Sequence, residues 1–340
     1  MHFRVQSYPP PQPLLFRRAV ETGLLRSAPV DIPEFLEVAD RLNSLRNRAL
    51  REQTITFAEA LGQVGIMTIA LKGSATLLDE PLQHDSCAMM SDIDLLVPSP
   101  QHERAMKIGM ALGYTVAMPI ADDSHSVVLR HPDCIATIDL HHDLGPQRHV
   151  LVADEAVDRA ENVPGLPLWR LSPSDQAIHN IYHAQIQDRY YELAILSLHQ
   201  LCNLGFLVER HGNRIDWDFV RSQFERRGYR FAFLAYLYAA ERLLGIQASS
   251  TVTFGRSERV HFKQMMLQLD WRWIRNLVTY PAILTSGTTE DRISYRRAMG
   301  LPIQSSAAAL TKLAIRALRR HRHAAFTKLA HAHRRRFGLR

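Results

Sequence analysis

The sequence predicts an α+β protein in which a mixed sheet is followed by an all-helical half. Between residues 66 and 140, short apolar runs rich in β-branched residues alternate with turns and one helical pattern. After about Leu171 the strand patterns end, and apolar residues recur at spacings of three and four, which is typical of helices. We expect an N-terminal extension over 1–32, an α/β core over 33–150, a helical domain over 151–306 and a helical arm over 307–340.

The elements of the core are expected in the following order. A helix spans 33–64 and ends at Gly65, and a second helix spans 101–112 and ends at Gly113. Strands are predicted over 66–71, 93–97, 114–118, 126–129 and 135–140.

The helical half is expected to begin at a recognisable cap. Ser172 stands at a cap position, Pro173 at the first helical position and Asp175 three residues after the serine. Further helices are predicted over 190–207, 217–227, 231–244 and 256–280, and from 307 to 336 in the arm.

The composition is that of an ordinary globular protein, with 46% hydrophobic and 22% charged residues in 340. No run of about 18 apolar residues occurs, so no transmembrane segment is expected. Prolines between Pro9 and Pro13 interrupt the N-terminus, which lacks the apolar centre of an export signal. The three cysteines are far apart and form no CxxC pair. A reducing cytoplasm is therefore the expected compartment.

The positive charge is concentrated at the C-terminal end. After Asp291 there are 13 lysines and arginines and no acidic residue. The preceding part has 28 basic and 34 acidic residues, a net charge of −6. The arm over 307–340 is therefore expected to contact a polyanion, either nucleic acid or an anionic membrane surface. The alternative is a charged helix that packs on the acidic body of its own chain.

Two carboxylates begin the second predicted strand. Asp92 and Asp94 are two residues apart, so their side chains project from the same face, while Ile93 and Leu95 project from the other. Carboxylates on one face repel each other unless a cation lies between them. We therefore expect that asparagine at either position leaves the fold as stable or more stable. A buried strand follows at once, and carboxylates at its edge are costly without a function such as binding Mg²⁺.

Two further segments extend this pattern. Lys72, Gly73 and Ser74 follow the first strand and combine a positive charge, close backbone approach and hydroxyl donors, which suits nucleotide phosphates. An ordinary strand-to-helix turn is the alternative. Asp139 lies in the last strand, where it can complete a metal site and accept a proton, or simply hydrogen-bond locally. His141 is expected to point away from Asp139, to the opposite strand face, and to have a supporting or structural role.

The order of these segments resembles the nucleotidyltransferase superfamily that includes DNA polymerase β and the aminoglycoside adenylyltransferases. More narrowly, it is similar to a bacterial nucleotidyltransferase family with a helical C-terminal half. The resemblance spans roughly residues 35–225 and rests on these segments: LKG at 71–73, DIDLLV at 92–97, DLH at 139–141, IHNIYHA at 178–184, LHQLCNL at 198–204 and RIDWDF at 214–219. The chain departs from the family pattern at Ala88, where an arginine is common, and at His199 and Gln200, where an aspartate is common.

The resemblance implies a polymerase-β-like core and transfer of a nucleoside monophosphate from an NTP, such as ATP, with release of pyrophosphate. It implies two Mg²⁺ ions, or Mn²⁺, held by Asp92, Asp94 and Asp139, with the triphosphate held by the lysine, glycine and serine at 72–74. The acceptor can be a small molecule, a protein or RNA. The alternative is a catalytically inactive module that binds nucleic acid or membrane through its arm. Inactive relatives usually lose a metal ligand, whereas all three carboxylates are present here.

Other histidine and tryptophan patterns are weaker. His179 and His183 share a helix face and can present two nitrogens to zinc, but the HExxH pattern is incomplete. They are expected to be structural or to line a cleft near the acceptor. A phosphohydrolase reading of His142 and Asp143 is disfavoured because the pair follows a strand. Finally, Trp271 and Trp273 either form an aromatic platform or are packing residues of a helix.

Overall fold

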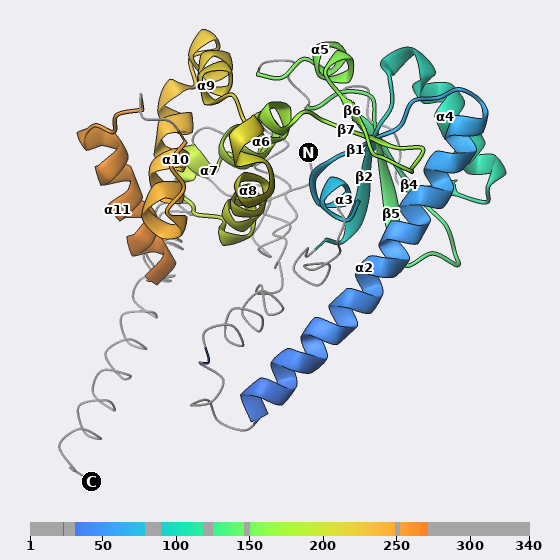
Figure 1. Cartoon of the computed structure of the whole chain (residues 1–340), viewed down its shortest axis with the longest axis horizontal. Helices are drawn as coiled ribbons and strands as arrows, with labels where there is room; N and C mark the ends of the chain where they lie inside the picture. The colour runs from blue at the N-terminus through green and yellow to red at the C-terminus, as the bar shows by residue number, and fades with distance from the viewer. Residues whose placement is uncertain are drawn as a thin grey trace, which may run out of the picture. The chain divides into compact units, whose positions relative to one another are not determined.

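The computed structural model describes residues 23, 31–78, 90–117, 125–145, 150–248 and 252–270 (Figure 1). The chain divides into two compact units. One comprises residues 9–189 and 197–259, and the other comprises residues 1–8, 190–196 and 260–340. The arm over 307–340, most of the extension over 1–32, Ala88, Trp271 and Trp273 lie outside the described residues. The domain boundaries expected at 150 and 306 remain predictions.

A seven-stranded sheet forms the centre of the larger unit, with the strand order β3-β4-β5-β2-β1-β7-β6. β2 runs parallel to β5 and β1 runs parallel to β7, whereas the other neighbours are antiparallel. The predicted mixed sheet is therefore confirmed. Its strands are β1 (Ile69–Ala70), β2 (Asp92–Leu96), β3 (Thr115–Val116), β4 (Ser126–Arg130), β5 (Thr137–His141), β6 (Glu161–Asn162) and β7 (Trp169–Arg170).

Several strands differ from their predicted extent. The first strand, expected over 66–71, is reduced to two residues, and the backbone turns shortly after it at Lys72, whose φ is +48°. The strand expected over 114–118 is also reduced to two described residues, with Met118 outside the described part. The strands β6 and β7 were not predicted, because two residues are too few to show an alternating pattern.

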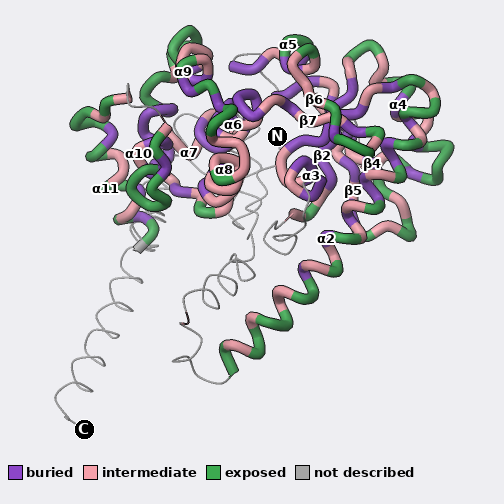
Figure 2. Tube along the Cα trace, viewed as in Figure 1, coloured by how far each residue is buried: buried purple, intermediate pink, exposed green. Residues whose placement is uncertain are grey.

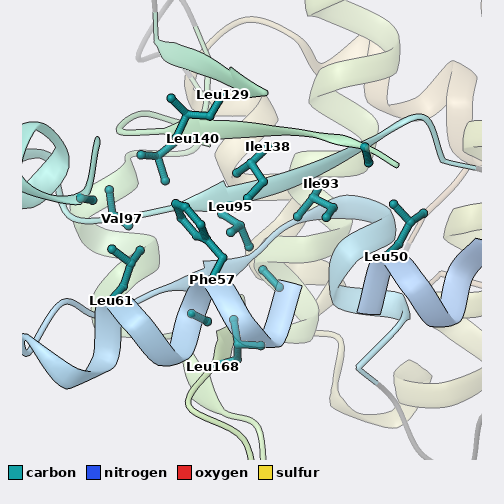
Figure 3. Close-up of a cluster of buried hydrophobic side chains, with 14 of the residues drawn as sticks. Leu50, Phe57, Leu61, Ile93, Leu95, Val97, Leu129, Ile138, Leu140 and Leu168 are labelled. Carbon is teal, nitrogen blue, oxygen red and sulfur yellow. The ribbon is translucent and has the colours of Figure 1, made fainter. Parts of the chain in front are cut away.

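Helix α2 (Asp31–Gln63) covers the apolar face of the sheet (Figure 3). Leu50, Phe57 and Leu61 on this helix are buried in one cluster with side chains of β2, β4 and β5. The strand residues of that cluster include Ile93, Leu95, Leu129, Ile138 and Leu140. Because strand side chains alternate between faces, the residues between them project from the opposite face. The aspartates of β2 and β5 therefore lie on the side of the sheet away from α2.

The remaining core helices are short. They are α3 (Lys72–Thr76), the 3-10 helix η2 (Ser99–Gln101), α4 (His102–Ala111) and α5 (Ala153–Asp158). The predicted helix over 101–112 is confirmed as α4, with η2 as its lead-in. Figure 2 shows that α2 is exposed over its first turns and becomes buried where it meets the sheet, and its first buried residue is Asn43.

Gly109 lies where α4 packs tightly against this core. A Cβ added there would lie 3.0 Å from Leu129 Cδ1 and 3.2 Å from Phe57 Cε2, whereas one added at Gly62 in α2 would lie 3.7 Å from Pro167 Cβ. Gly62→Ala is expected to raise the free energy of unfolding by up to about 1 kcal/mol through helix propensity. Gly109→Ala is expected to lower the free energy of unfolding by about 1 kcal/mol or more, because the cost of overpacking exceeds the gain in helix propensity. Urea unfolding measures both, and equal shifts of the same sign would show that this contact is loose.

The helical half consists of α6 (Pro173–Tyr182), the π-helix η3 (His183–Gln187), α7 (Tyr190–Leu193), α8 (Leu198–His211), the 3-10 helix η4 (Gly212–Arg214), α9 (Trp217–Arg226), α10 (Arg230–Leu244) and α11 (Arg256–Asp270). The predicted cap is confirmed, because Ser172 Oγ accepts from the Asp175 N–H at 3.2 Å. The single helix predicted over 190–207 is wrong. The chain leaves the helix at Ala194, with φ +48°, and Ser197 caps α8 instead.

Candidate active site

Two carboxylates meet on the polar face of the sheet. Asp94 of β2 and Asp139 of β5 are directly opposite each other in parallel strands, so their side chains project from the same face. Asp94 is 5% exposed. One oxygen from each carboxylate and a ring nitrogen of His141 all lie within 4.8 Å of one another. This group is a donor set that can hold a single divalent ion.

Asp92 lies at the outer end of the same strand face. It is not part of the group of three and is opposite Thr137 in the register. Its Oδ1 accepts a hydrogen bond from Ser91 Oγ at 3.0 Å. Burial raises the pKa of Asp92, and the neighbouring charge of Asp94 raises it further. The repulsion expected from the sequence is therefore present at this carboxylate.

His141 corrects one expectation. The expectation that it points to the strand face opposite Asp139 is wrong, because residues two apart on a strand share a face. In the structure, His141 Nε2 lies 3.1 Å from Asp94 Oδ1 and 3.4 Å from Asp139 Oδ2. Burial alone would lower its pKa, but the charge of Asp139 and the hydrogen bonds to both carboxylates raise the pKa of His141 to about 9. The imidazolium thus compensates the two carboxylates when no metal is bound.

Lys72 is the second cation at this site. Its Nζ donates to Asp94 Oδ1 at 2.7 Å. Burial disfavours the charged amine, but Asp94 and the other two aspartates outweigh this and hold the pKa of Lys72 above its ordinary value. Lys72 also has a left-handed backbone, with φ +48°, which is uncommon outside glycine and concentrates at functional sites. The turn thus directs the ammonium onto the carboxylate.

The same turn holds the backbone of Asp94 from both sides. The Leu71 N–H donates to the Asp94 carbonyl oxygen at 3.0 Å, and the Asp94 N–H donates to Ser74 Oγ at 3.0 Å. Ser74 is fully buried. The structure therefore shows Ser74 as a support for Asp94, and its predicted contact with a triphosphate stays a prediction. A Cβ added at Gly73 would lie 3.0 Å from Met90 Sδ, so this glycine lets the turn pass close to a neighbouring side chain.

The aspartates opposite each other remain ionised. Burial by itself would raise the pKa of Asp94, but the Lys72 charge and the His141 hydrogen bond hold it well below its usual range. Burial also opposes ionisation of Asp139, yet the charge and hydrogen bond of His141 lower its pKa. His125, whose ring centroid lies 5.4 Å from that of His141, has a pKa lowered to about 4 by burial and by the His141 charge. No sequence pattern distinguishes His125 as a residue of this site.

The raised pKa of His141 predicts how metal-free protein responds to alkali. A histidine whose pKa rises on folding stabilises the fold fully below its unfolded pKa, near 6.5, and this contribution is lost as the pH passes about 9. Thermal unfolding in EDTA should show a loss of stability between these pH values. His141→Asn should show a smaller loss. Parallel pH profiles for the two proteins would mean that the imidazolium does not hold the carboxylates together.

A cavity opens beside Lys72 toward the helical half. Its lining includes residues at the start of α3 and polar side chains from α6, η3 and α8. His179 and His183 both line it, as one of the sequence alternatives expected. Their ring centroids are 6.3 Å apart, and neither belongs to a potential metal-binding group among the described residues. His142 and Asp143 follow the end of β5, and Asp143 Oδ1 accepts from the Leu144 N–H at 2.7 Å, so this aspartate supports the local backbone after the strand.

Comparison with known proteins identifies the family of the chain. The model of a family described as uncharacterised nucleotidyltransferase matches residues 12–245, and the chain belongs to this family. A solution structure of the antibiotic-resistance factor ANT(2'')-Ia is similar with a TM-score of 0.37 and 15% identity, over 58% of this chain and 97% of that one. A likeness this distant has no bearing on the substrate. No curated protein matches the sequence.

The helices in the described part of the chain do not combine the length and the apolar character that crossing a membrane requires.

Proposed function

We propose that the protein transfers a nucleoside monophosphate from an NTP to an acceptor hydroxyl or similar group in a metal-dependent reaction that releases pyrophosphate. The observation that carries this proposal is the register of β2 and β5, which sets Asp94 opposite Asp139 on the polar face of the sheet. Their residue numbers are 45 apart, so the fold, and not sequence adjacency, brings the two together. Membership in a nucleotidyltransferase family supports the same reaction class.

The donor set fits a divalent ion. Oxygen atoms of Asp94 and Asp139 suit Mg²⁺ or Mn²⁺, and a nitrogen ligand from His141 would favour Mn²⁺ of the two. Asp92, at the outer end of the same face, would contribute to a second ion. Bound metal would neutralise charge on the phosphates and orient the acceptor oxygen.

The side chains have separate roles in this proposal. Lys72 would exchange its contact with Asp94 for one with the triphosphate as metal and NTP bind. The backbone of Gly73 would approach the phosphates, and Ser74 would reach them only by giving up its hydrogen bond to the Asp94 N–H. Asp139, ionised and half-buried, would accept the proton of the attacking hydroxyl.

The test is to incubate the protein with each of the four common NTPs, Mg²⁺ or Mn²⁺, and a small-molecule extract. Two readouts are followed: release of pyrophosphate, and a mass increase of one acceptor by a nucleotide unit. Both should require metal and should be absent in Asp139→Asn. If no NTP is consumed with either metal, the proposed reaction is wrong. The inactive binding module would then be favoured instead, and it would bind a polyanion without any turnover.

A further inference from the structure

The described residues that line the cavity beside Lys72 include basic side chains and no acidic ones. Fifteen described residues line it, and none is an aspartate or glutamate. The formal charges in the lining belong to Lys72 and Arg210, and the other polar members are amides, histidines and one threonine. Phe206 and Leu207 add apolar surface. Asp188, which is not in the lining, lies 3.4 Å from His183 Nδ1. A ligand with several positive charges would thus find no carboxylate among the described lining residues to neutralise it.

Hydrogen bonds orient one wall of the cavity. Asn180 Nδ2 donates to both the backbone oxygen and Oε1 of Gln200 at 3.1 Å, and Tyr236 donates to Asn180 Oδ1 at 3.1 Å. Because Asn180 occupies the Gln200 oxygen, the Gln200 amide can offer its N–H groups to a ligand. The side chain of Asn203 forms no hydrogen bond with another described residue, so its amide can donate to and accept from a ligand.

His179 supplies an independent sign of a ligand. It is 5% exposed and lines the cavity, its ring nitrogens form no hydrogen bond with another described residue, and they do not belong to the fully buried atoms that lack a partner, so a ligand in the cavity can reach them. Burial, and then the charge of Lys72, keep the pKa of His179 well below its ordinary value, so the ring is neutral. A neutral imidazole can both donate and accept a hydrogen bond. A hydroxyl group bound in the cavity would therefore find both a donor and an acceptor on this ring.

We propose that this cavity is the acceptor site and that the acceptor is a small, hydroxyl-rich molecule of zero or negative charge, not a polycation. The proposal rests on the proposed function. A hydroxyl oxygen of the acceptor forms a bond to the α-phosphorus of the NTP. The bond from that phosphorus to the bridging oxygen breaks, and pyrophosphate leaves with the electron pair. The hydroxyl proton passes to Asp139 and then to water. The amides and His179 hold the other hydroxyl groups.

Three cyclitols with one ring scaffold test the charge preference in the full-length protein with Mg²⁺. They are myo-inositol, which is neutral, an inositol monophosphate, which is anionic, and 2-deoxystreptamine, which is a dication. Calorimetry or ligand-observed NMR measures each Kd. The dication is expected to bind at least about tenfold more weakly than the other two. Equal affinities, tightest binding of the dication, or no binding of any of the three would overturn the proposal.

Matched variants locate the site. Asn203→Leu should weaken binding of both hydroxyl-rich probes by about tenfold, because losing one good hydrogen bond in a desolvated site changes the Kd by about this factor. Asn213→Leu, at an exposed position in η4 outside the lining, should leave their Kd values unchanged. Equal effects of both variants would contradict the assignment.

A final experiment distinguishes an acceptor site from a site for the sugar of the NTP. A non-hydrolysable NTP analogue should bind together with myo-inositol, whereas competition between them would show that the cavity receives the nucleotide and would overturn the acceptor assignment. NTP consumption is measured separately. Binding that follows charge without any NTP consumption would contradict the proposed reaction while leaving the charge preference of the cavity in place.

Discussion

Asp94→Asn is expected to lower the rate of nucleotidyl transfer by about a thousandfold or more. A metal ion supplies several kcal/mol of transition-state stabilisation, and about 1.4 kcal/mol corresponds to a factor of ten. Asp94 is the carboxylate that both Lys72 and His141 contact, and it is opposite Asp139 in the sheet. Pyrophosphate release at saturating NTP and metal measures the effect. Turnover within a few fold of the unchanged protein would remove Asp94 from the mechanism.

The free energy of unfolding in the absence of metal distinguishes the two aspartates of β2. From the sequence alone, asparagine at either position is expected to leave the fold as stable or more stable. The structure corrects this for Asp94, because its charge is compensated by Lys72 and His141. Asp94→Asn should therefore lower the free energy of unfolding in the absence of metal by about 1–3 kcal/mol. Asp92 has a raised pKa and disfavours the fold when ionised, so Asp92→Asn should leave stability unchanged or raise it.

Asp175→Ala is expected to have the largest effect on stability, a loss of about 3 kcal/mol. Asp175 has no exposed side-chain surface, and it accepts two hydrogen bonds from Arg159, at 2.9 and 2.8 Å. Ser172 Oγ donates to it at 2.7 Å. Removing the carboxylate leaves these donors without their acceptor and weakens the first turn of α6, the helix that carries His179 and Asn180 into the cavity.

An exposed ion pair provides the control for this experiment. Glu103 and Lys107 are 2.7 Å apart on α4, and both side chains are mostly exposed. Glu103→Ala should leave the midpoint of thermal unfolding almost unchanged, because water and salt screen exposed pairs. If Asp175→Ala behaves like this control, the buried pair contributes nothing net, and the position of α6 depends on apolar packing alone.

The positions of the three aspartates along the strands follow from local sequence patterns. The alternation in DIDLL placed Asp92 and Asp94 on one face, and the structure agrees, since Ile93 and Leu95 are fully buried in the cluster under α2. The same rule of alternation, applied to DLH, would have placed His141 beside Asp139. The sequence is therefore sufficient to place His141 on the same strand face as Asp139.

Other features depend on contacts that no local pattern encodes. The ion pair of Lys72 with Asp94 needs a left-handed backbone at a lysine, which residue preferences argue against. The cavity needs α6 and α8 to pack beside the start of α3, and such long-range packing leaves no periodic trace in the sequence. The break between α7 and α8 was also missed, because the apolar spacing continues through Ala194, where the chain leaves the helix.

The central claim is that Asp94 and Asp139 hold one divalent ion, and titration with Mn²⁺ followed by electron paramagnetic resonance tests it most directly. Free Mn²⁺ gives a strong six-line signal that weakens when the ion binds, so the Kd is obtained without any substrate or turnover. Asp139→Asn should weaken binding by at least about tenfold, because it removes one of the two charged ligands. Asp154→Asn, at an exposed position in α5, should leave the Kd unchanged. Equal Mn²⁺ affinity in the unchanged protein and in Asp139→Asn would contradict the claim.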